Sequence, residues 1–343
     1  MGKRHIAAFD YLRIFFCFAV VAWHTNMLGV TNMLYKTGSV NISFIDVMYY
    51  NVLLLAVPVF MQIALYLYLK NRLEKPKYFL SRIKYLFVVY IFWTILSTII
   101  LQDGGFKISY FKDWKYILTG AHTQIYFIFS LIIMTIIVEI MIKLQQLLSN
   151  RKFIALQIIL LGINLAVFLF RLPIEQYVLN NEYSYLLFSF WAPTNFLPYT
   201  FLTFIAVDLQ KKNKINFNLK IMCPILIVIV SVIYLEWRNL VSPINVHFEI
   251  FLMPTYGRIS VILSTFIILL VAISNEIRFN SIVKKISDLT FSIFLVHYTI
   301  MLKLQVVWPG MYDRVKTSNF MIFLAVMSIS LTIAYIFNKF KIL

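Results

Sequence analysis

Three ionisable residues, Asp10, Arg13 and His24, fall within one apolar stretch near the start of the chain, residues 7–29. A charged side chain at the centre of a membrane helix costs about 2.5–3.5 kcal/mol on insertion scales, so such residues commonly serve a function. Asp10 and Arg13 are three positions apart and therefore share a helical face. His24 follows Arg13 by eleven positions, which is about three turns or about 16 Å of helix, and lies nearly on the same line.

These residue types suit acid–base and anion-binding chemistry. An imidazole, with an ordinary pKa of about 6.5, can act as a general base near neutral pH. A guanidinium binds phosphate well. Each residue also has a plainer interpretation: His24 as an interfacial polar residue, Arg13 extending to the membrane surface, and Asp10 neutralising Arg13. Their placement on one line favours the functional interpretation.

The composition predicts an all-α, polytopic membrane protein. The chain has 343 residues, 61% hydrophobic and 13% charged, with a mean hydropathy of +0.83, whereas soluble domains carry about 25% charged residues. Apolar runs of the length needed to cross a bilayer as a helix occur ten times. We therefore predict one membrane-embedded domain over 1–343, with spans at 7–29, 45–69, 83–101, 123–143, 153–170, 185–207, 219–236, 256–273, 287–305 and 319–337.

The distribution of basic residues predicts the orientation. About two-thirds of the 31 Lys and Arg residues fall in loops on one side of these spans, which predicts that both termini are cytoplasmic. Topology thus accounts for the net charge of +17, and no nucleic-acid partner is predicted. Arg13 is expected near the cytoplasmic face and His24 near the outer face. The cysteines, Cys17 and Cys223, lie in apolar segments and predict neither a disulfide nor a metal site.

The longest predicted outer connections carry aromatic, amide and imidazole side chains. They include Trp114, His122, Gln124, Trp237 and His247. Rings that stack and amides that hydrogen-bond are typical of a carbohydrate-binding cleft. Aromatic residues are equally typical of the belt at a membrane surface, and both interpretations stay open.

The opening segment, DYLR followed by ten residues and a histidine, resembles membrane-bound acyltransferase family 3. Three later stretches resemble the same family in order. They are VPVFMQIALYLY at 57–68, SRIKYLFVVYIFW at 81–93 and ISDLTFSIFLVHYTIM at 286–301, which contains His297. Two features depart from the family pattern: Ile63-Ala64 replaces a Ser-Gly pair, and Arg82 and Lys84 replace paired arginines. The chain is most similar to the branch found in biofilm and capsule polysaccharide operons, some of whose members have been described as exporters.

The resemblance implies an enzyme of the bacterial cell membrane that moves an acetyl or similar group from cytosolic acyl-CoA to a hydroxyl of an extracytoplasmic or lipid-linked carbohydrate. His24 would be the catalytic base. Arg13, Asp10, Arg82 and Lys84 would bind the donor. Acyl-CoA would be a co-substrate, with no bound cofactor, and the lipid bilayer and polysaccharide biosynthesis proteins are the other expected partners.

His297 and Glu139 are further candidates, for the acceptor side. The alternatives are helix packing for His297 and a local ion pair with Lys143 for Glu139; for Arg82 and Lys84 the alternative is the positive-inside bias. Two other functions also remain: an exporter of polysaccharide or lipid-linked sugar, and a structural partner in a polysaccharide synthase. A purely structural partner explains neither Arg13 nor His24.

Overall fold

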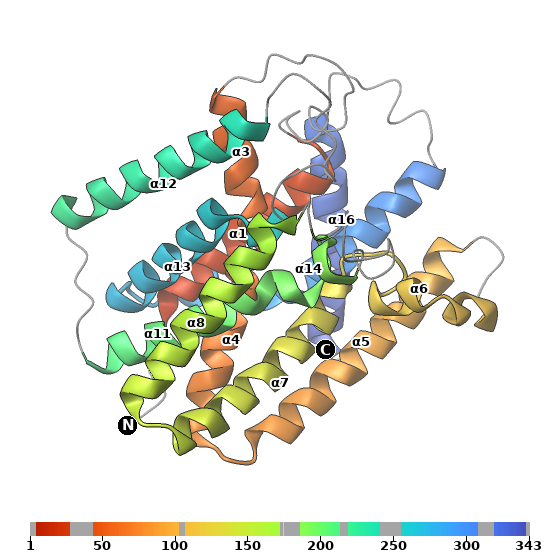
Figure 1. Ribbon diagram of the computed structural model, residues 1–343. Helices are drawn as coiled ribbons and strands as arrows, with labels where there is room; N and C mark the ends of the chain where they lie inside the picture. The colour runs from red at the N-terminus through yellow and green to blue at the C-terminus, as the bar shows by residue number, and fades with distance from the viewer. Residues whose placement is uncertain are drawn as a thin grey trace.

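A computed structural model describes residues 5–27, 44–102, 107–171, 174, 186–212, 219–240, 255–307 and 319–340. Within these ranges the chain is built of helices and turns (Figure 1). Each of the ten predicted spans overlaps a helix. The helices are α1 (Ala7–His24), α3 (Phe44–Leu54), α4 (Ala56–Glu74), α5 (Tyr78–Leu101), α6 (Trp114–Leu118), α7 (Tyr126–Leu147), α8 (Asn150–Leu169), α11 (Leu197–Lys211), α12 (Leu219–Leu240), α13 (Ile259–Ser274), α14 (Ser281–Val307) and α16 (Asn319–Lys339), with 3-10 turns η1 (Ile108–Lys112), η2 (Pro193–Phe196) and η4 (Thr255–Gly257).

The helices have the length and surface of membrane spans. Among the described residues, seven helical segments of at least 18 residues are apolar enough to cross a membrane. The remaining three predicted spans correspond to α11, α12 and α13. Large apolar side chains such as Val88, Ile158 and Ile227 are exposed, whereas Ser130 and Thr200 are fully buried. Apolar side chains on the outside, and polar side chains buried within an otherwise apolar core, fit an all-α polytopic membrane protein.

Proline explains where two predicted spans differ from the structure. The span at 45–69 is two helices, α3 and α4, that meet at Leu55. Pro58 has no N–H to donate to the carbonyl of Leu54, four residues earlier, so one hydrogen bond of the helix is lost where α3 gives way to α4. The span at 185–207 becomes a continuous helix only at Leu197, because Pro193 starts the 3-10 turn η2 and Pro198 occupies the first turn of α11.

Helix α1 lies inside the bundle, where it packs against α14, α4, α3 and α16. In Figure 1, α12 and α5 lie at opposite edges of the view, with α1, α4 and α14 between them. We call the two ends of the bundle the Arg13 end and the His24 end, after the residues of α1 found there. The turn between α4 and α5 is at the Arg13 end, and the segment before α7 is at the His24 end, as the cavities described below establish.

Candidate functional site

Helix α1 ends on His24 because of the residues that follow it. The N–H of Asn26 donates to the carbonyl of Trp23 at 3.1 Å. The N–H of Met27 donates to the carbonyl of Ala22 at 3.0 Å. This pair of hydrogen bonds closes a helix when the residue past its end adopts a left-handed conformation, and Asn26 does so with φ of 50°. His24 is thereby held in the last turn of α1.

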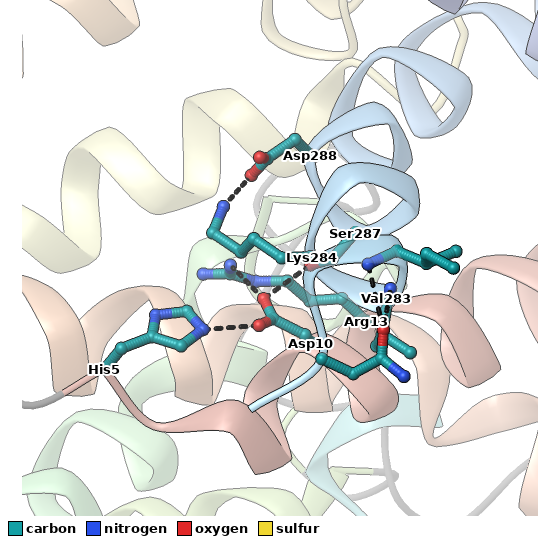
Figure 2. Close-up of polar contacts among 9 residues, drawn as sticks. His5, Asp10, Arg13, Val283, Lys284, Ser287 and Asp288 are labelled. Atoms are coloured by element: carbon teal, nitrogen blue, oxygen red, sulfur yellow. Dashed lines mark hydrogen bonds and ion pairs between the residues drawn. The ribbon is translucent and has the colours of Figure 1, made fainter. Parts of the chain in front are cut away.

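Asp10 lies at the centre of a polar cluster near the start of α1 (Figure 2). Its side chain is buried, only 2% exposed. Oδ1 accepts a hydrogen bond from Ser287 Oγ at 2.8 Å and lies 3.9 Å from Arg13 Nη1. Oδ2 lies 2.5 Å from His5 Nε2. The predicted pairing of Asp10 with Arg13 is confirmed, and α14 and the segment before α1 each supply a further partner.

Helix α14 reaches this cluster because of how it starts. Asn280 Oδ1 accepts hydrogen bonds from the N–H groups of Ile282 and Val283 at 2.9 and 3.3 Å. The asparagine thus satisfies two N–H groups that a helix start leaves without a partner. Ser287 lies in the second turn of α14, where its hydroxyl meets Asp10 (Figure 2).

A cavity of about 330 Å³, the Arg13 cavity, opens beside this cluster. Its lining includes Arg13 and Arg82, together with Asp288. Asp288 forms an ion pair with Lys284 (Figure 2), so its charge is already balanced. Asp10 likewise pairs with Arg13, so the Arg82 guanidinium is the excess charge. The cavity and its border therefore carry net positive charge and two guanidinium groups, which suit the recognition of phosphate.

Arg82 and Lys84, the two predicted donor-binding residues of α5, are placed differently. Arg82 is partly buried in the wall of the Arg13 cavity, and its guanidinium lies 5.8 Å from the ring centroid of Tyr85. Lys84 is exposed and is not among the residues that line this cavity. Two positions along a helix turn a side chain by about 200°. The placement of Lys84 does not support donor binding and fits the positive-inside alternative.

A second cavity, of about 470 Å³, opens at the other end of α1 and is lined by His24. We call it the His24 cavity. Aromatic rings form much of its wall, among them Trp23, Trp191, Tyr256 and Tyr298. A concave site that combines flat apolar rings with hydrogen-bonding groups suits a carbohydrate.

Two of the residues predicted for a carbohydrate cleft, His122 and Gln124, line the His24 cavity. Trp114 begins α6 and is not among the lining residues. His247 and the side chain of Trp237 lie outside the described part of the chain. Gln124 is buried at 4% exposure, which an interfacial aromatic belt does not explain.

His24 packs against two rings of α14. Its ring centroid lies 5.2 Å from that of His297 and 4.6 Å from that of Tyr298. His297 is fully buried, and its Nδ1 lies 2.8 Å from the carbonyl oxygen of Phe294. That contact needs a proton on Nδ1 and leaves a lone pair on Nε2. Within the described ranges Nε2 has no hydrogen-bond partner.

The Arg13 cavity and the His24 cavity are separate. They have no lining residue in common. The ring of Phe294 lies 5.7 Å from that of Phe60, 5.1 Å from that of Phe127 and 5.8 Å from that of His297, all between centroids. These phenylalanines line the Arg13 cavity. They form a cluster that closes this cavity on the side facing the two histidines.

Glu139, which we expected on the acceptor side, lies at the Arg13 end. Its carboxylate accepts hydrogen bonds from Arg72 Nε and Nη2, at 2.8 and 2.5 Å, and from the hydroxyl of Tyr68 at 3.1 Å. Tyr68 lines the Arg13 cavity. Helix α7 starts with Tyr126 in the His24 cavity and runs several turns toward the Arg13 end before it reaches Glu139. The pair joins α4 to α7 and is not local to one helix.

We expect Glu139→Gln to destabilise the protein by about 1–3 kcal/mol, because it removes the charged partner of Arg72 in a pair that joins α4 to α7. The melting temperature in detergent measures this loss. The matched control is Asp208→Asn, which breaks an exposed pair with Lys212 of the same 2.5 Å length and should change stability by less than about 1 kcal/mol. Equal melting temperatures for both variants and the parent would contradict the structural role of Glu139.

A buried ion pair supports the wall of the His24 cavity. Arg258 is 2% exposed, and its Nη2 lies 3.0 Å from Glu236 Oε2 and 3.1 Å from Asn51 Oδ1. These contacts tie the start of α13 to α12 and α3. The preceding turn η4 carries Tyr256, whose carbonyl accepts a hydrogen bond from Tyr199 at 2.6 Å. The turn that presents Tyr256 to the cavity is thus held from both sides.

Several site residues were not predicted from the sequence. In the sequence His5 is marked only by its position just before the first span, and in the structure its ring reaches Asp10 from two residues before α1. Ser287, Asp288 and Tyr298 lie within the family-like stretch at 286–301. The resemblance of that stretch to the family could have pointed to these residues. Only the packing of α14 against α1 shows which of its side chains face the site.

Comparison with known proteins identifies one family. The sequence profile of acyltransferase family 3, described as "Acyltransferase domain", matches residues 6–339. No curated protein and no solved structure matches the chain. The matched range contains every residue named above as lining the Arg13 or the His24 cavity.

Proposed function

The chain belongs to membrane-bound acyltransferase family 3, and from this premise we propose that it moves an acetyl or similar acyl group from cytosolic acyl-CoA to a hydroxyl of an extracytoplasmic or lipid-linked carbohydrate. Membership makes it an enzyme, a multi-pass membrane acyltransferase that transfers groups other than aminoacyl groups. One observation carries the finer proposal. A single helix, α1, presents a guanidinium to a cationic cavity at one end and an imidazole to an aromatic cavity at the other.

The donor occupies the Arg13 cavity in this proposal. Arg13 and Arg82 bind the phosphate groups of acyl-CoA, and Asp10 orients Arg13 while reducing the cost of burying it. The pantetheine arm extends toward the ring of Phe294. Because the phenylalanine cluster separates the cavities, the thioester reaches His24 only when Phe294 changes its rotamer.

The acceptor occupies the His24 cavity, with one hydroxyl at the imidazole of His24. His24 takes the hydroxyl proton as the oxygen attacks the thioester carbonyl. An ester bond forms and the carbon–sulfur bond breaks. The leaving thiolate receives the proton from His24, which returns the imidazole to its starting state.

His297 acts behind His24 as a positioning residue. Its Nδ1–H donates to the Phe294 carbonyl, so its Nε2 carries a lone pair that can accept a hydrogen bond. In this proposal the donor is an N–H of the His24 ring. Holding that proton in place would keep the other nitrogen of His24 unprotonated and ready to act as a base.

The loop charges support an orientation with the Arg13 end in the cytoplasm. Lys75, Lys77, Arg278 and Lys285 lie in or beside the turns at that end. Cytoplasmic loops carry such an excess of Lys and Arg. This orientation matches a cytosolic donor with an outer acceptor. In this proposal the enzyme works in a bacterial cell membrane, where polysaccharide biosynthesis proteins supply its acceptor.

The test is a comparison of surface glycans by mass spectrometry between a strain deleted for this gene and its parent. A normal amount of glycan that lacks acyl groups in the deletion strain is the expected result. Glycan that accumulates inside the cell would overturn the proposal in favour of an exporter. Unchanged glycan, both in amount and in acylation, would overturn both.

We expect Arg82→Ala to raise the dissociation constant of CoA about tenfold, since a charged hydrogen bond contributes about 1.5 kcal/mol or more. Lys84→Ala is the matched control, because Lys84 carries the same charge two positions away but is exposed. Isothermal titration with CoA on the purified protein measures both variants. Equal weakening by both would mean that CoA senses general surface charge and not the Arg13 cavity.

A further inference from the structure

The segment that joins α6 to α7 has an unusual backbone and lines the His24 cavity. Gly120, Ala121 and His122 all adopt the left-handed conformation, with φ of 59°, 61° and 55°. A side chain disfavours this region, so two of the three residues are strained. Such strain persists only where the surroundings enforce it, and it concentrates at binding and catalytic sites.

Hydrogen bonds from two buried threonines hold this segment in place. Thr119 Oγ1 accepts the backbone N–H of His122 at 3.1 Å, and Thr123 Oγ1 donates to the carbonyl of Gly120 at 2.6 Å. Position 120 itself tolerates no side chain, because a Cβ there would lie 2.7 Å from Cβ of Ile125. The segment is therefore rigid, and the residue that leaves it toward α7 is Gln124.

The orientation of the Gln124 amide is determined by α14. Its Nε2 donates to the carbonyl oxygens of Phe294 and Leu295 at 3.0 and 2.6 Å. If the amide were flipped, Oε1 would face these two carbonyl oxygens, and two acceptors cannot form a hydrogen bond. The flipped orientation is therefore excluded. Oε1 accepts no hydrogen bond from any described residue, although Gln124 is 96% buried on a cavity wall.

Gln124 also lies close to the two histidines. The Phe294 carbonyl that it contacts is the one that binds His297 Nδ1. His297 and Tyr298, in the next turn of α14, carry the rings that pack on His24. Gln124 and His24 therefore line one cavity, and a ligand bound there can meet both.

We propose that Gln124 is an acceptor-binding residue whose Oε1 accepts a hydrogen bond from a second donor group on the carbohydrate, next to the hydroxyl that is acylated. This inference rests on the proposed function. An amide oxygen can only accept, and the reacting hydroxyl gives its proton to His24. The acceptor therefore carries another hydroxyl or an amide N–H beside the acylated position, and a sugar with an ether or a deoxy carbon there is a poor substrate.

An oxygen without a partner does not mark a site by itself, and Gln62 provides the comparison. Gln62 is 1% exposed, its Nε2 donates to Tyr199 and Thr203 at 3.3 and 3.2 Å, and its Oε1 also has no partner among the described residues. It lines neither the Arg13 cavity nor the His24 cavity. Gln62→Met and Gln124→Met thus remove the same chemical groups, only one of them at the site.

The experiment measures transfer from acetyl-CoA to surface glycan purified from the deletion strain, together with the rise in melting temperature that CoA produces. Gln124→Met should lower the transfer rate at limiting glycan more than tenfold and keep the stabilisation by CoA, whereas Gln62→Met should match the parent. Gln124→Glu retains an acceptor oxygen and, when protonated, a donor for the Phe294 carbonyl. It should therefore be several-fold more active than Gln124→Met.

Three outcomes overturn the inference: full activity of Gln124→Met, a loss of CoA stabilisation equal to the loss of transfer, or equal activities of Gln124→Met and Gln124→Glu. The last result also decides the case in which Gln124→Met folds poorly, because a purely structural role gives no advantage to a glutamate oxygen. A parent protein that transfers no acyl group refutes the proposed function itself, and so the two failures are distinct.

Discussion

Replacing His24 with alanine is expected to lower the rate of acyl transfer by about two to four orders of magnitude, the contribution typical of a general base. The side chain lines the His24 cavity at the last turn of α1, against the rings of His297 and Tyr298. No other group in the proposed mechanism takes the hydroxyl proton. The measurement is transfer from acetyl-CoA to glycan from the deletion strain, with the variant in membranes.

The control for His24→Ala is the donor side of the same helix. Arg13 lies about three turns away, so CoA should still raise the melting temperature of the variant as it does for the parent. Loss of transfer with retained CoA stabilisation places the defect after donor binding, at the acceptor or in the chemical step. If the variant transfers acyl groups at the parental rate, His24 is not the general base.

Replacing Arg13 with alanine is expected to weaken CoA binding by about 10- to 150-fold, since hydrogen bonds to charged groups contribute about 1.5–3 kcal/mol. The loss should fall in the upper part of this range. Asp10 would remain as a carboxylate at the Arg13 cavity, with His5 and Ser287 as its other partners, and it would repel phosphate. Titration of the purified protein with CoA gives the dissociation constant.

Two further variants separate the role of Arg13 from that of general charge. Arg13→Lys keeps the charge but loses the planar fork, so its affinity for CoA should be intermediate. Arg151→Ala removes an exposed arginine at the start of α8 and should leave CoA binding unchanged. Comparable losses in Arg13→Ala and Arg151→Ala would count against a specific donor site at Arg13.

The membrane fold and the pairing on α1 were accessible from sequence because both are local. Apolar runs of sufficient length predict spans, and all ten overlap helices. Asp10 and Arg13 meet because three positions on a helix bring side chains to one face. The helix break at Leu55 is also local, because Pro58 lies three residues later in the sequence. The apolar run nevertheless predicted one uninterrupted span at 45–69.

The placements that differ from expectation concern contacts between helices. Glu139 was expected to meet an acceptor, yet its partner is Arg72 on another helix at the Arg13 end. Lys84 shares its charge and neighbourhood with Arg82 but faces away from the Arg13 cavity. Positions within a span define which residues are neighbours along one helix, but they do not define the rotation of that helix against the next.

The sequence by itself determined that this is a polytopic membrane protein with an acid, a guanidinium and an imidazole on its first helix, because bilayer thickness and helical periodicity act along one segment. Only the tertiary structure decided that Arg13 and His24 open into separate cavities, that the Phe294 cluster closes one from the other, and that Gln124 and His297 share a carbonyl of α14. These features depend on which faces of α1, α7 and α14 pack together. In lipid that choice rests on the close fit and hydrogen bonds of many side chains far apart in the chain, which no single segment encodes.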